Sequence, residues 1–374
     1  MKIGVLTLPL HTNYGGVLQA YALQYSLRSM GHDAFLIDCR IDPRYVNIVK
    51  YPIAWCLKAA SKIMPPIAKY LHPLELQMLS DKVIIRRNTE SFIAKNIQLK
   101  HFFSLSFIPK HCFDAIVVGS DQVWRPKYFK PIESAYLDFT RSWDIKRVAY
   151  AASFGVEQWE YSPEQHSRCG SLLSHFDSIS LRELSGVELC RHHFGREATL
   201  VLDPTLLLSP DIYRSLIIHG SSVHVGGGLL VSILDMTDDK CQVVSSLGSH
   251  YKTTAFSVNS RVEDRTAPLE ERIQPPVEQW LRGFIEADYV VTDSFHAMVF
   301  AIIFNKPFVA YANIDRGYTR FYSLLSLLGL ESQIITNFDE LAVESCFQIE
   351  WGGVNKRLEQ LREESLNFLR HSLA

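Results

Sequence analysis

Short apolar runs alternate with helix-length segments along almost the whole chain. The runs 3–8, 113–118 and 289–291 are rich in aliphatic residues, and each is followed within two residues by glycine, proline or aspartate. This pattern is typical of the buried strands of a parallel sheet. Segments such as 17–30 and 277–286, which lie between these runs, have the length and composition of helices. The alternation predicts an α/β protein built from parallel sheets.

A glycine- and proline-containing break near residues 208–228 divides this alternation into two halves. Each half has its own strands and helices, so we predict two Rossmann-like domains that face a cleft. The loops at the carboxyl ends of the strands are expected to line that cleft. The layout is similar to that of the two-domain (GT-B type) glycosyltransferases, although layout alone does not assign an activity. The predicted segments are 1–208, 209–354 and a C-terminal helix at 355–374.

Residues 43–110 interrupt the strand–helix alternation of the first half. They contain several lysines among apolar residues, and Pro65-Pro66 breaks the segment. We interpret the segment as helices inserted into the first domain. Two functions remain open for them: to cover the sheet, which we favour, or to lie on a membrane surface and accept a lipid-linked substrate.

Composition limits the class of protein. Hydrophobic residues make up 47% and charged residues 21% of the 374 residues, which is typical of a folded protein, and the net charge of -2 gives no basic footprint for nucleic acid. Seven dispersed cysteines without a C-x-x-C pair predict reduced thiols and a cytosolic setting.

The chain shows no signal for membrane insertion or a metal centre. Its first residues are strand-like rather than typical of a signal peptide. The most apolar stretch, 289–311, contains Asp293, His296 and Lys306 and is therefore not expected to span a membrane. The adjacent His192 and His193 point in different directions on a helix, so we expect no metal site there.

His296 occupies the most suggestive position. It lies in the first turn of a predicted helix that directly follows the strand 289–291, at the carboxyl end of that strand. Residues 292–294 are expected to cap this helix through their side chains. Free N–H groups and the helix dipole favour an anion at such a place, and a histidine adds a proton or a positive charge. The alternative is a core histidine without a functional role.

Three other predicted strands end in polar or glycine-containing loops. The first loop, which follows the strand 3–8, contains the adjacent glycines Gly15 and Gly16 rather than G-x-G-x-x-G. Such a loop could bind an anion or a sugar, or it could be only a tight turn. In the second, Asp121 is placed to orient or deprotonate a hydroxyl, or only to cap the next turn. In the third, Arg182 is suited to a carboxylate or phosphate, with a structural Arg182–Glu183 ion pair as the alternative.

Several of these segments, taken in order, resemble the polysaccharide pyruvyl transferase family. The matching segments are 12–20, 113–124, 149–155, 180–183, 202–205, 292–296 and 305–308. The resemblance implies transfer of a pyruvyl group from phosphoenolpyruvate to two hydroxyls of a sugar, in a polysaccharide or its lipid-linked precursor. The product is a cyclic ketal and phosphate is released. No cofactor or metal is implied, because phosphoenolpyruvate is the co-substrate.

By the resemblance, His296 and Arg182 match the residues that hold phosphoenolpyruvate. Some members of the family carry an arginine where Ser294 stands here, so another basic residue is needed to complete the anion site. The candidates for the donor site are therefore Arg182, Ser294, His296, Lys306, Arg316 and Arg320.

The remaining candidates concern catalysis and the acceptor. His296 or a carboxylic acid is the predicted acid, and Asp121 or Glu183 is the predicted base. The residues predicted to bind the acceptor are Asn13, Tyr14, Gly15, Gly16, Ser120, Asp121 and Gln122. We expect a cytosolic protein, or one peripheral to the inner face of the membrane. The competing hypotheses are a glycosyltransferase that uses a nucleotide sugar and a family member without catalytic activity.

Overall fold

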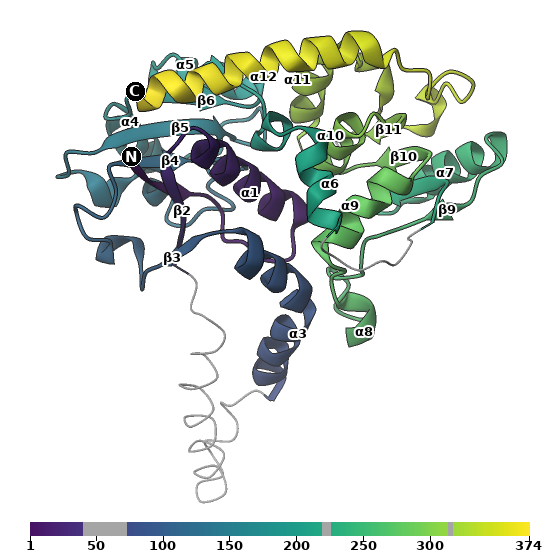
Figure 1. Ribbon diagram of the computed structural model, residues 1–374, viewed down its shortest axis with the longest axis horizontal. Helices are drawn as coiled ribbons and strands as arrows, with labels where there is room; N and C mark the ends of the chain where they lie inside the picture. The colour runs from purple at the N-terminus through teal and green to yellow at the C-terminus, as the bar shows by residue number, and fades with distance from the viewer. Residues whose placement is uncertain (40–72, 219–225, 313–316) are drawn as a thin grey trace, which may run out of the picture.

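The computed structural model describes residues 1–39, 73–218, 226–312 and 317–374, and these residues form two parallel sheets (Figure 1). The first sheet has seven strands in the order β3-β2-β1-β4-β5-β6-β7, and the second has five in the order β12-β11-β10-β8-β9. Strands of the first sheet are β1 Lys2–Leu6, β2 Asp33–Asp38, β3 Leu99–His101, β4 Ala115–Val118, β5 Lys146–Ala152, β6 Ser178–Leu181 and β7 Thr199–Leu200. Strands of the second are β8 Leu229–Ser232, β9 Ala255–Phe256, β10 Tyr289–Thr292, β11 Phe308–Tyr311 and β12 Ile334–Ile335.

Helices cover both sheets, so the strands are buried, and their residues are mostly apolar. Val5 of β1 pairs with Leu36 of β2 and Val117 of β4, and all three are almost completely buried. Parallel strands covered on both faces need such continuous apolar runs. The helices are α1 Tyr14–Ser29, α3 Pro73–Asn96, α4 Pro163–Leu173, α5 Leu184–Phe194, α6 Pro210–Ile218, α7 Asp238–His250, α8 Leu269–Arg272, α9 Val277–Glu286, α10 Phe295–Ile303, α11 Tyr318–Leu328 and α12 Trp351–Leu373.

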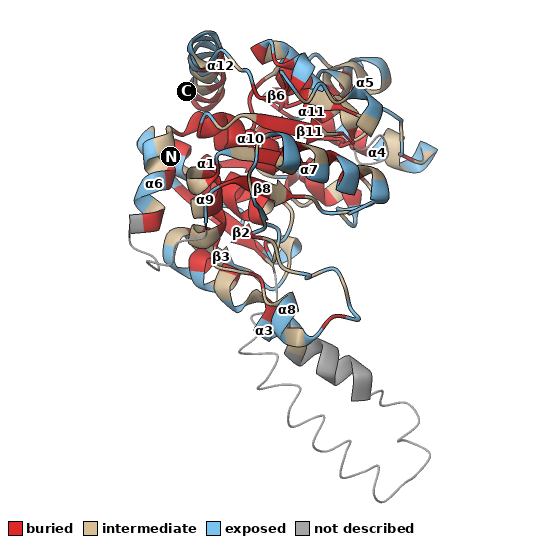
Figure 2. Ribbon diagram, turned by 90° about the vertical axis from the view of Figure 1, so that its right-hand side faces the viewer, coloured by how far each residue is buried: buried red, intermediate tan, exposed pale blue. Residues whose placement is uncertain are grey.

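The two halves share one hydrophobic core. A single cluster of buried residues contains Ile3 and Leu18 from the first half, and Val290 and Phe300 from the second. Helix α10 is buried over all nine of its residues, as expected of a helix that is apolar all round. Figure 2 shows buried residues running through both sheets, with exposed residues on outer helices such as α12. The contact between the halves is thus apolar and extensive.

The C-terminal helix returns to the first sheet. In Figure 1, α12 runs from the second half of the molecule back across the first. Its Ser365 hydroxyl accepts a hydrogen bond from the Leu202 N–H at 3.0 Å, and the rings of Phe368 and Tyr150 lie 6.2 Å apart. The predicted C-terminal helix is therefore present, although it begins before residue 355.

Two features of the fold differ from the prediction. Helix α6 lies within the predicted linker, because Pro210 occupies the first position of a helix, where proline is tolerated. Strand β3 lies within the segment 43–110, for which the sequence predicts inserted helices, whereas α3 of the same segment is a helix. Residues 43–72 of this segment are outside the described residues. Of the helices in the described ranges, none has the length and apolar character needed to cross a membrane.

Candidate functional site

Polar side chains from both sheets meet where strands β4, β6 and β10 end. Asp121 follows β4, Arg182 and Glu183 follow β6, and His296 lies in the first turn of α10, directly after β10. Helix α1 begins beside them, after the carboxyl end of β1. The strand ends of the two sheets therefore face each other, as the sequence predicts, and the site lies between the two halves of the chain.

Arg182 is surrounded by carboxylates. Its Nη1 donates to Asp203 Oδ2 at 2.7 Å and its Nη2 donates to Asp121 Oδ1 at 3.0 Å, while Nε lies 3.8 Å from Glu183 Oε2. The side chain has no exposed surface. Burial alone lowers the pKa of Arg182, but the charges of Asp121 and Asp203 outweigh it and raise the pKa above its usual value. Arg182 is therefore a permanent cation within the protein, with both Nη atoms committed to carboxylates.

His296 comes from the second half of the chain and contacts residues of the first half. Its Nε2 lies 3.7 Å from Asp203 Oδ2, and the side chain is only 10% exposed. Nε2 is buried and has no hydrogen-bond partner within the described part of the chain. The Nδ1 and Cγ atoms lie against Gly15, where a Cβ atom would collide with them. Only glycine allows α1 to approach the imidazole this closely.

Asp203 connects these groups, although it is not among the residues that the sequence predicts for the site. Its Oδ1 accepts hydrogen bonds from the Thr205 N–H at 3.0 Å and the Thr205 hydroxyl at 2.6 Å. Its Oδ2 faces Arg182 and His296. Burial raises the pKa of Asp203, but His296 and Arg182 outweigh burial and hold the pKa far below its ordinary range. The segment 202–205 was visible as a strand end, but its partners are distant in sequence.

Asp121 follows β4, and its ionised carboxylate lies beside the start of α1. Burial raises its pKa, whereas the charges of Arg182, His296 and Arg320 lower it, and the net shift is downward. Its backbone has a φ of 69°, a left-handed conformation that is uncommon for residues other than glycine. A Cβ atom at Gly16 would lie 3.9 Å from Asp121 Oδ2. Asp121 thus lies next to the glycine loop.

Glu183 differs from the other two carboxylates. Its Oε1 accepts hydrogen bonds from the N–H groups of Phe154 and Gly155 at 2.9 and 3.4 Å. Its Oε2 is buried and lacks a hydrogen-bond partner among the residues that the structure describes. Burial raises the pKa of Glu183 above its ordinary value, because Arg182 and Arg320 compensate for burial only in part. Glu183 is therefore the carboxyl group of the cluster that takes up a proton most readily.

Arg320 from α11 brings a second guanidinium to the cluster. The guanidinium carbons of Arg182 and Arg320 lie 5.0 and 5.7 Å from the centre of the Phe295 ring. Burial and the charge of Arg182 lower the pKa of Arg320 to about 10, so it remains a cation at neutral pH. Of the basic candidates for the donor site, Arg320 is placed with Arg182 and His296.

Ser294 precedes α10, but the start of this helix is not capped by side chains of residues 292–294 in the way that the sequence predicts. The Ser294 side chain makes no capping hydrogen bond. The Thr292 hydroxyl accepts from the Ser294 N–H at 2.9 Å, and Asp293 binds Lys240 Nζ at 2.8 Å. The predicted side-chain cap is therefore wrong, because the side chains of Thr292 and Asp293 are used elsewhere. The first turn of α10 keeps N–H groups that no Ser294 oxygen satisfies.

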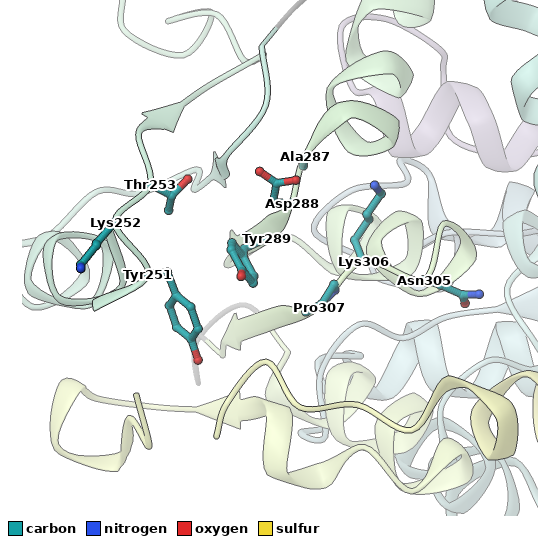
Figure 3. A pocket seen from close by; sticks show the side chains of 9 residues that line it. All are labelled: Tyr251, Lys252, Thr253, Ala287, Asp288, Tyr289, Asn305, Lys306 and Pro307. Carbon is teal, nitrogen blue, oxygen red and sulfur yellow. The ribbon is translucent and has the colours of Figure 1, made fainter. Parts of the chain in front are cut away.

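Lys306 lies away from the cluster. It immediately precedes Pro307 and β11, whereas His296 follows β10. Since β10 and β11 are neighbouring parallel strands, Lys306 lies at their amino ends and His296 at their carboxyl ends. Figure 3 shows Lys306 in a polar pocket of about 530 Å³, lined by Tyr251, Lys252, Thr253, Ala287, Asp288, Tyr289, Asn305, Lys306 and Pro307. Burial lowers the pKa of Lys306. The prediction that Lys306 completes the anion site is at odds with this position, and Arg316 lies outside the described residues.

The residues predicted to bind the acceptor divide into two groups. The hydroxyl of Tyr14 donates to the Pro275 carbonyl at 2.7 Å, and its ring stacks on Trp280 with centroids 5.1 Å apart. Ser120 is completely buried and donates to the Ala151 carbonyl at 2.9 Å. The side chains of Tyr14 and Ser120 therefore hold the protein together rather than face a ligand.

The other predicted acceptor residues surround the start of α1 and the end of β4. Asn13 caps α1 by accepting from the Gly16 N–H at 3.2 Å. Gln122 accepts from Arg125 Nη1 at 3.2 Å. Gly15 and Gly16 lie beside His296 and Asp121, as described above. The structure thus brings the glycine loop and Asp121 together with the proposed donor residues.

The fold and the site define a two-domain α/β protein of the GT-B type with a polar cluster between its halves. A sequence model of the family described as "Polysaccharide pyruvyl transferase" matches residues 13–316, which is most of the chain. The protein therefore belongs to the polysaccharide pyruvyl transferase family. Membership indicates a transferase that acts on polysaccharides. No curated protein matches the chain.

The chain is similar to several solved structures at low sequence identity. A glycosyltransferase from Rickettsia africae is similar with a TM-score of 0.50 at 12% identity, covering 100% of this chain and 97% of that chain. UDP-N-acetylglucosamine 2-epimerase from Rickettsia bellii has a TM-score of 0.48 at 10% identity, covering 100% and 99%. UGT89C1 from Arabidopsis thaliana has a TM-score of 0.47 at 10% identity, covering 98% of each chain.

Proposed function

We propose that the protein transfers the pyruvyl group of phosphoenolpyruvate to two hydroxyls of a sugar in a polysaccharide or its precursor. The product is a cyclic ketal, and phosphate is the leaving group. The observation that carries the proposal is the meeting of His296, Arg320 and the glycine loop of α1 beside buried carboxylates, in a chain of the pyruvyl transferase family.

The donor is a small polyanion, and the site offers cationic and N–H donors for it. Arg320 and His296 come from the second half of the chain, and the first turn of α10 adds N–H groups at the positive end of a helix dipole. Arg182 has no exposed side-chain surface and is paired with Asp121 and Asp203. We therefore assign direct donor contacts to Arg320, His296 and the start of α10, and a supporting position to Arg182.

The chemistry requires one proton for the donor and removes two from the acceptor. Protonation of the methylene carbon makes the neighbouring carbon electrophilic, and the first sugar hydroxyl adds to it. The second hydroxyl then displaces phosphate and closes the ketal. One hydroxyl proton returns to the acid of the protein that protonated the methylene carbon, and the other leaves with phosphate. The protein must therefore supply one acid and one base, placed close together.

The environments of the titratable groups divide these roles. Asp121 stays ionised, because the net effect of its surroundings lowers its pKa, so it accepts a hydrogen bond from a sugar hydroxyl and orients it. His296 is assigned the proton donation, since it lies between Asp203 and the glycine loop. Glu183 is the second acid candidate, because burial raises its pKa. We assign the acceptor contacts to Asp121 and Gly16.

The test is direct observation of the product. Phosphoenolpyruvate labelled with ¹³C at C2 is incubated with the protein and candidate acceptor oligosaccharides, and released phosphate is quantified in parallel. The proposal predicts a ketal carbon signal in the NMR spectrum and one phosphate for each ketal. Transfer of a sugar from a nucleotide sugar, with no reaction of phosphoenolpyruvate under the same conditions, would instead support the glycosyltransferase alternative.

A further inference from the structure

The carboxylate of Asp203 and the glycine at position 15 lie near different atoms of the His296 side chain. Asp203 Oδ2 is 3.7 Å from Nε2, and Nε2 is buried without a hydrogen-bond partner among the described residues. Nδ1 lies on the other side of the ring, beside Gly15 at the start of α1. The two ring nitrogens therefore have different surroundings: Nε2 faces an interior carboxylate, and Nδ1 faces the loop that borders Asp121.

Asp203 is held in one orientation before any ligand arrives. Thr205 donates two hydrogen bonds to Oδ1, from its N–H and its hydroxyl. Arg182 Nη1 donates to Oδ2 at 2.7 Å, and the Ser120 hydroxyl lies 3.2 Å from the same atom. The side chain is 1% exposed. The partner of one imidazole nitrogen influences which of the two nitrogens carries the proton. A carboxylate fixed by four contacts is such a partner, because its position beside Nε2 does not change.

We infer that Asp203 is a positioning residue for His296: its negative charge, 3.7 Å from Nε2, favours a proton on that nitrogen, so that Nδ1 is the atom that delivers the proton to the methylene carbon of phosphoenolpyruvate. The inference rests on the proposed function. In the step, the imidazole starts with a proton on both nitrogens; the Nδ1–H bond breaks, and the π pair of the C=C bond forms the new C–H bond at the methylene carbon. The neighbouring carbon becomes electrophilic and is attacked by the first sugar hydroxyl. The electron pair of the Nδ1–H bond stays on Nδ1, and the Nε2–H tautomer remains beside Asp203.

The assignment separates Asp203 from the other two carboxylates of the cluster. Asp121 lies next to Gly16, towards the acceptor, and Glu183 accepts from the backbone of residues 154 and 155. Only Asp203, of these three, has an ion-pair contact with the His296 ring in the described part of the chain. Loss of its charge should therefore act on proton delivery more than on donor binding.

The experiment measures phosphate release by the full-length protein at saturating acceptor, with phosphoenolpyruvate varied, for wild type, Asp203→Asn, His296→Gln and the double variant. Asp203→Asn is expected to lower kcat by roughly 10²-fold, within the range of general acid catalysis, with a much smaller change in KM for phosphoenolpyruvate. The double variant is expected to have the kcat of His296→Gln alone, because Asp203 acts through the imidazole.

A matched control is Asp293→Asn. Asp293 is as buried as Asp203 and pairs with the buried Lys240, but no described contact joins it to the His296 ring. Any loss of kcat caused by Asp293→Asn should be equal in the wild-type and His296→Gln backgrounds, since it reflects a general disturbance of the fold. Asp203→Asn, by contrast, should lower kcat in the wild-type background and should have no further effect on kcat once His296 is replaced by Gln.

A second variant covers the case in which Asp203→Asn does not fold. Thr205→Val removes one hydrogen bond to Oδ1 but keeps the charge of Asp203 and its pair with Arg182. It is expected to lower kcat in the wild-type background and to leave it unchanged in the His296→Gln background. Equal losses in both backgrounds, or a wild-type kcat for Asp203→Asn, would overturn the inference alone. A wild-type protein that releases no phosphate would overturn the proposed function and, with it, the inference.

Discussion

Gly15 and His296 touch across the boundary between the two halves of the chain. The Nδ1 and Cγ atoms of the imidazole occupy the space that a side chain at Gly15 would need. Gly15 belongs to the first turn of α1, after β1, and His296 belongs to the first turn of α10, after β10. The contact brings together two helix starts that both follow the carboxyl end of a strand.

Gly15→Ala tests how tightly this contact is made. The new methyl group must displace the His296 ring, and such overpacking costs typically about 1–3 kcal/mol of unfolding free energy. Gly16→Ala is the matched control, because a Cβ atom there has no neighbour closer than 3.7 Å. Alanine at that helix position is expected to be neutral or stabilising by up to roughly 1 kcal/mol. Urea unfolding of both variants gives the comparison, and equal stabilities would contradict the close contact.

Arg182→Ala is expected to be strongly destabilising. It leaves Asp121 and Asp203 buried without their main cation, and breaking a buried pair on one side costs about 3–5 kcal/mol. Arg168→Ala is the control, since Arg168 is 67% exposed and its Glu133 partner lies 3.5 Å away. That exposed pair should contribute less than about 1 kcal/mol. A loss as small as that of the control would show that Arg182 does not hold the carboxylates together.

Glu183→Gln changes how stability depends on pH. The pKa of Glu183 is raised in the folded protein, so its contribution to stability is fully present below the ordinary value of 4.5 and is lost as pH rises through the folded pKa. The Gln variant has no such group. Its unfolding free energy relative to wild type should therefore rise as pH increases above about 4.5. Denaturant unfolding at a series of pH values measures this difference, and a constant difference would count against the raised pKa.

Asp203 and Asp121 act in the opposite direction. Their folded pKa values are lowered, so the stability they contribute is present above the ordinary carboxyl pKa of about 3.9 and is lost as pH falls through the folded values. Wild type is expected to lose stability in acid, below about pH 4, more steeply than Asp203→Asn. Acid unfolding followed by circular dichroism tests this. Parallel curves for the two proteins would disagree with the lowered pKa of Asp203.

Much of the fold follows from local sequence signals. Helix α9 has the predicted bounds, because Pro276 precedes it and its apolar residues recur on one face. Helix α7 also begins at a local signal, since the Thr237 hydroxyl accepts from the Lys240 N–H at its start. Helix α6 was missed because serine and proline at residues 209 and 210 are equally typical of a linker and of a helix start. Local composition cannot separate these two cases.

The site was predictable only in part, because its decisive contacts are long-range. The strand-end positions of Arg182 and His296 are visible in the sequence, and the structure places both residues at one cluster. Asp203 was missed, since its importance comes from partners on other strand ends. Tyr14 was interpreted as a ligand contact, whereas it stacks on Trp280 from the other half. Lys306 precedes Pro307 and β11, so it lies at the amino end of its strand, whereas Arg182 and His296 follow the carboxyl ends of theirs. This position is at odds with the predicted role of Lys306 in the anion site.

The most direct test of the central claim is stabilisation by phosphoenolpyruvate, measured as a thermal shift on wild type, His296→Gln, Arg320→Gln and Lys306→Gln. A ligand that binds only the folded state, present at a concentration of about 100 times its Kd, raises the free energy of unfolding by about 2.7 kcal/mol. We predict a clear shift for wild type and Lys306→Gln and its loss in His296→Gln and Arg320→Gln. A shift that survives in His296→Gln and Arg320→Gln but disappears in Lys306→Gln would contradict a donor site between the two halves.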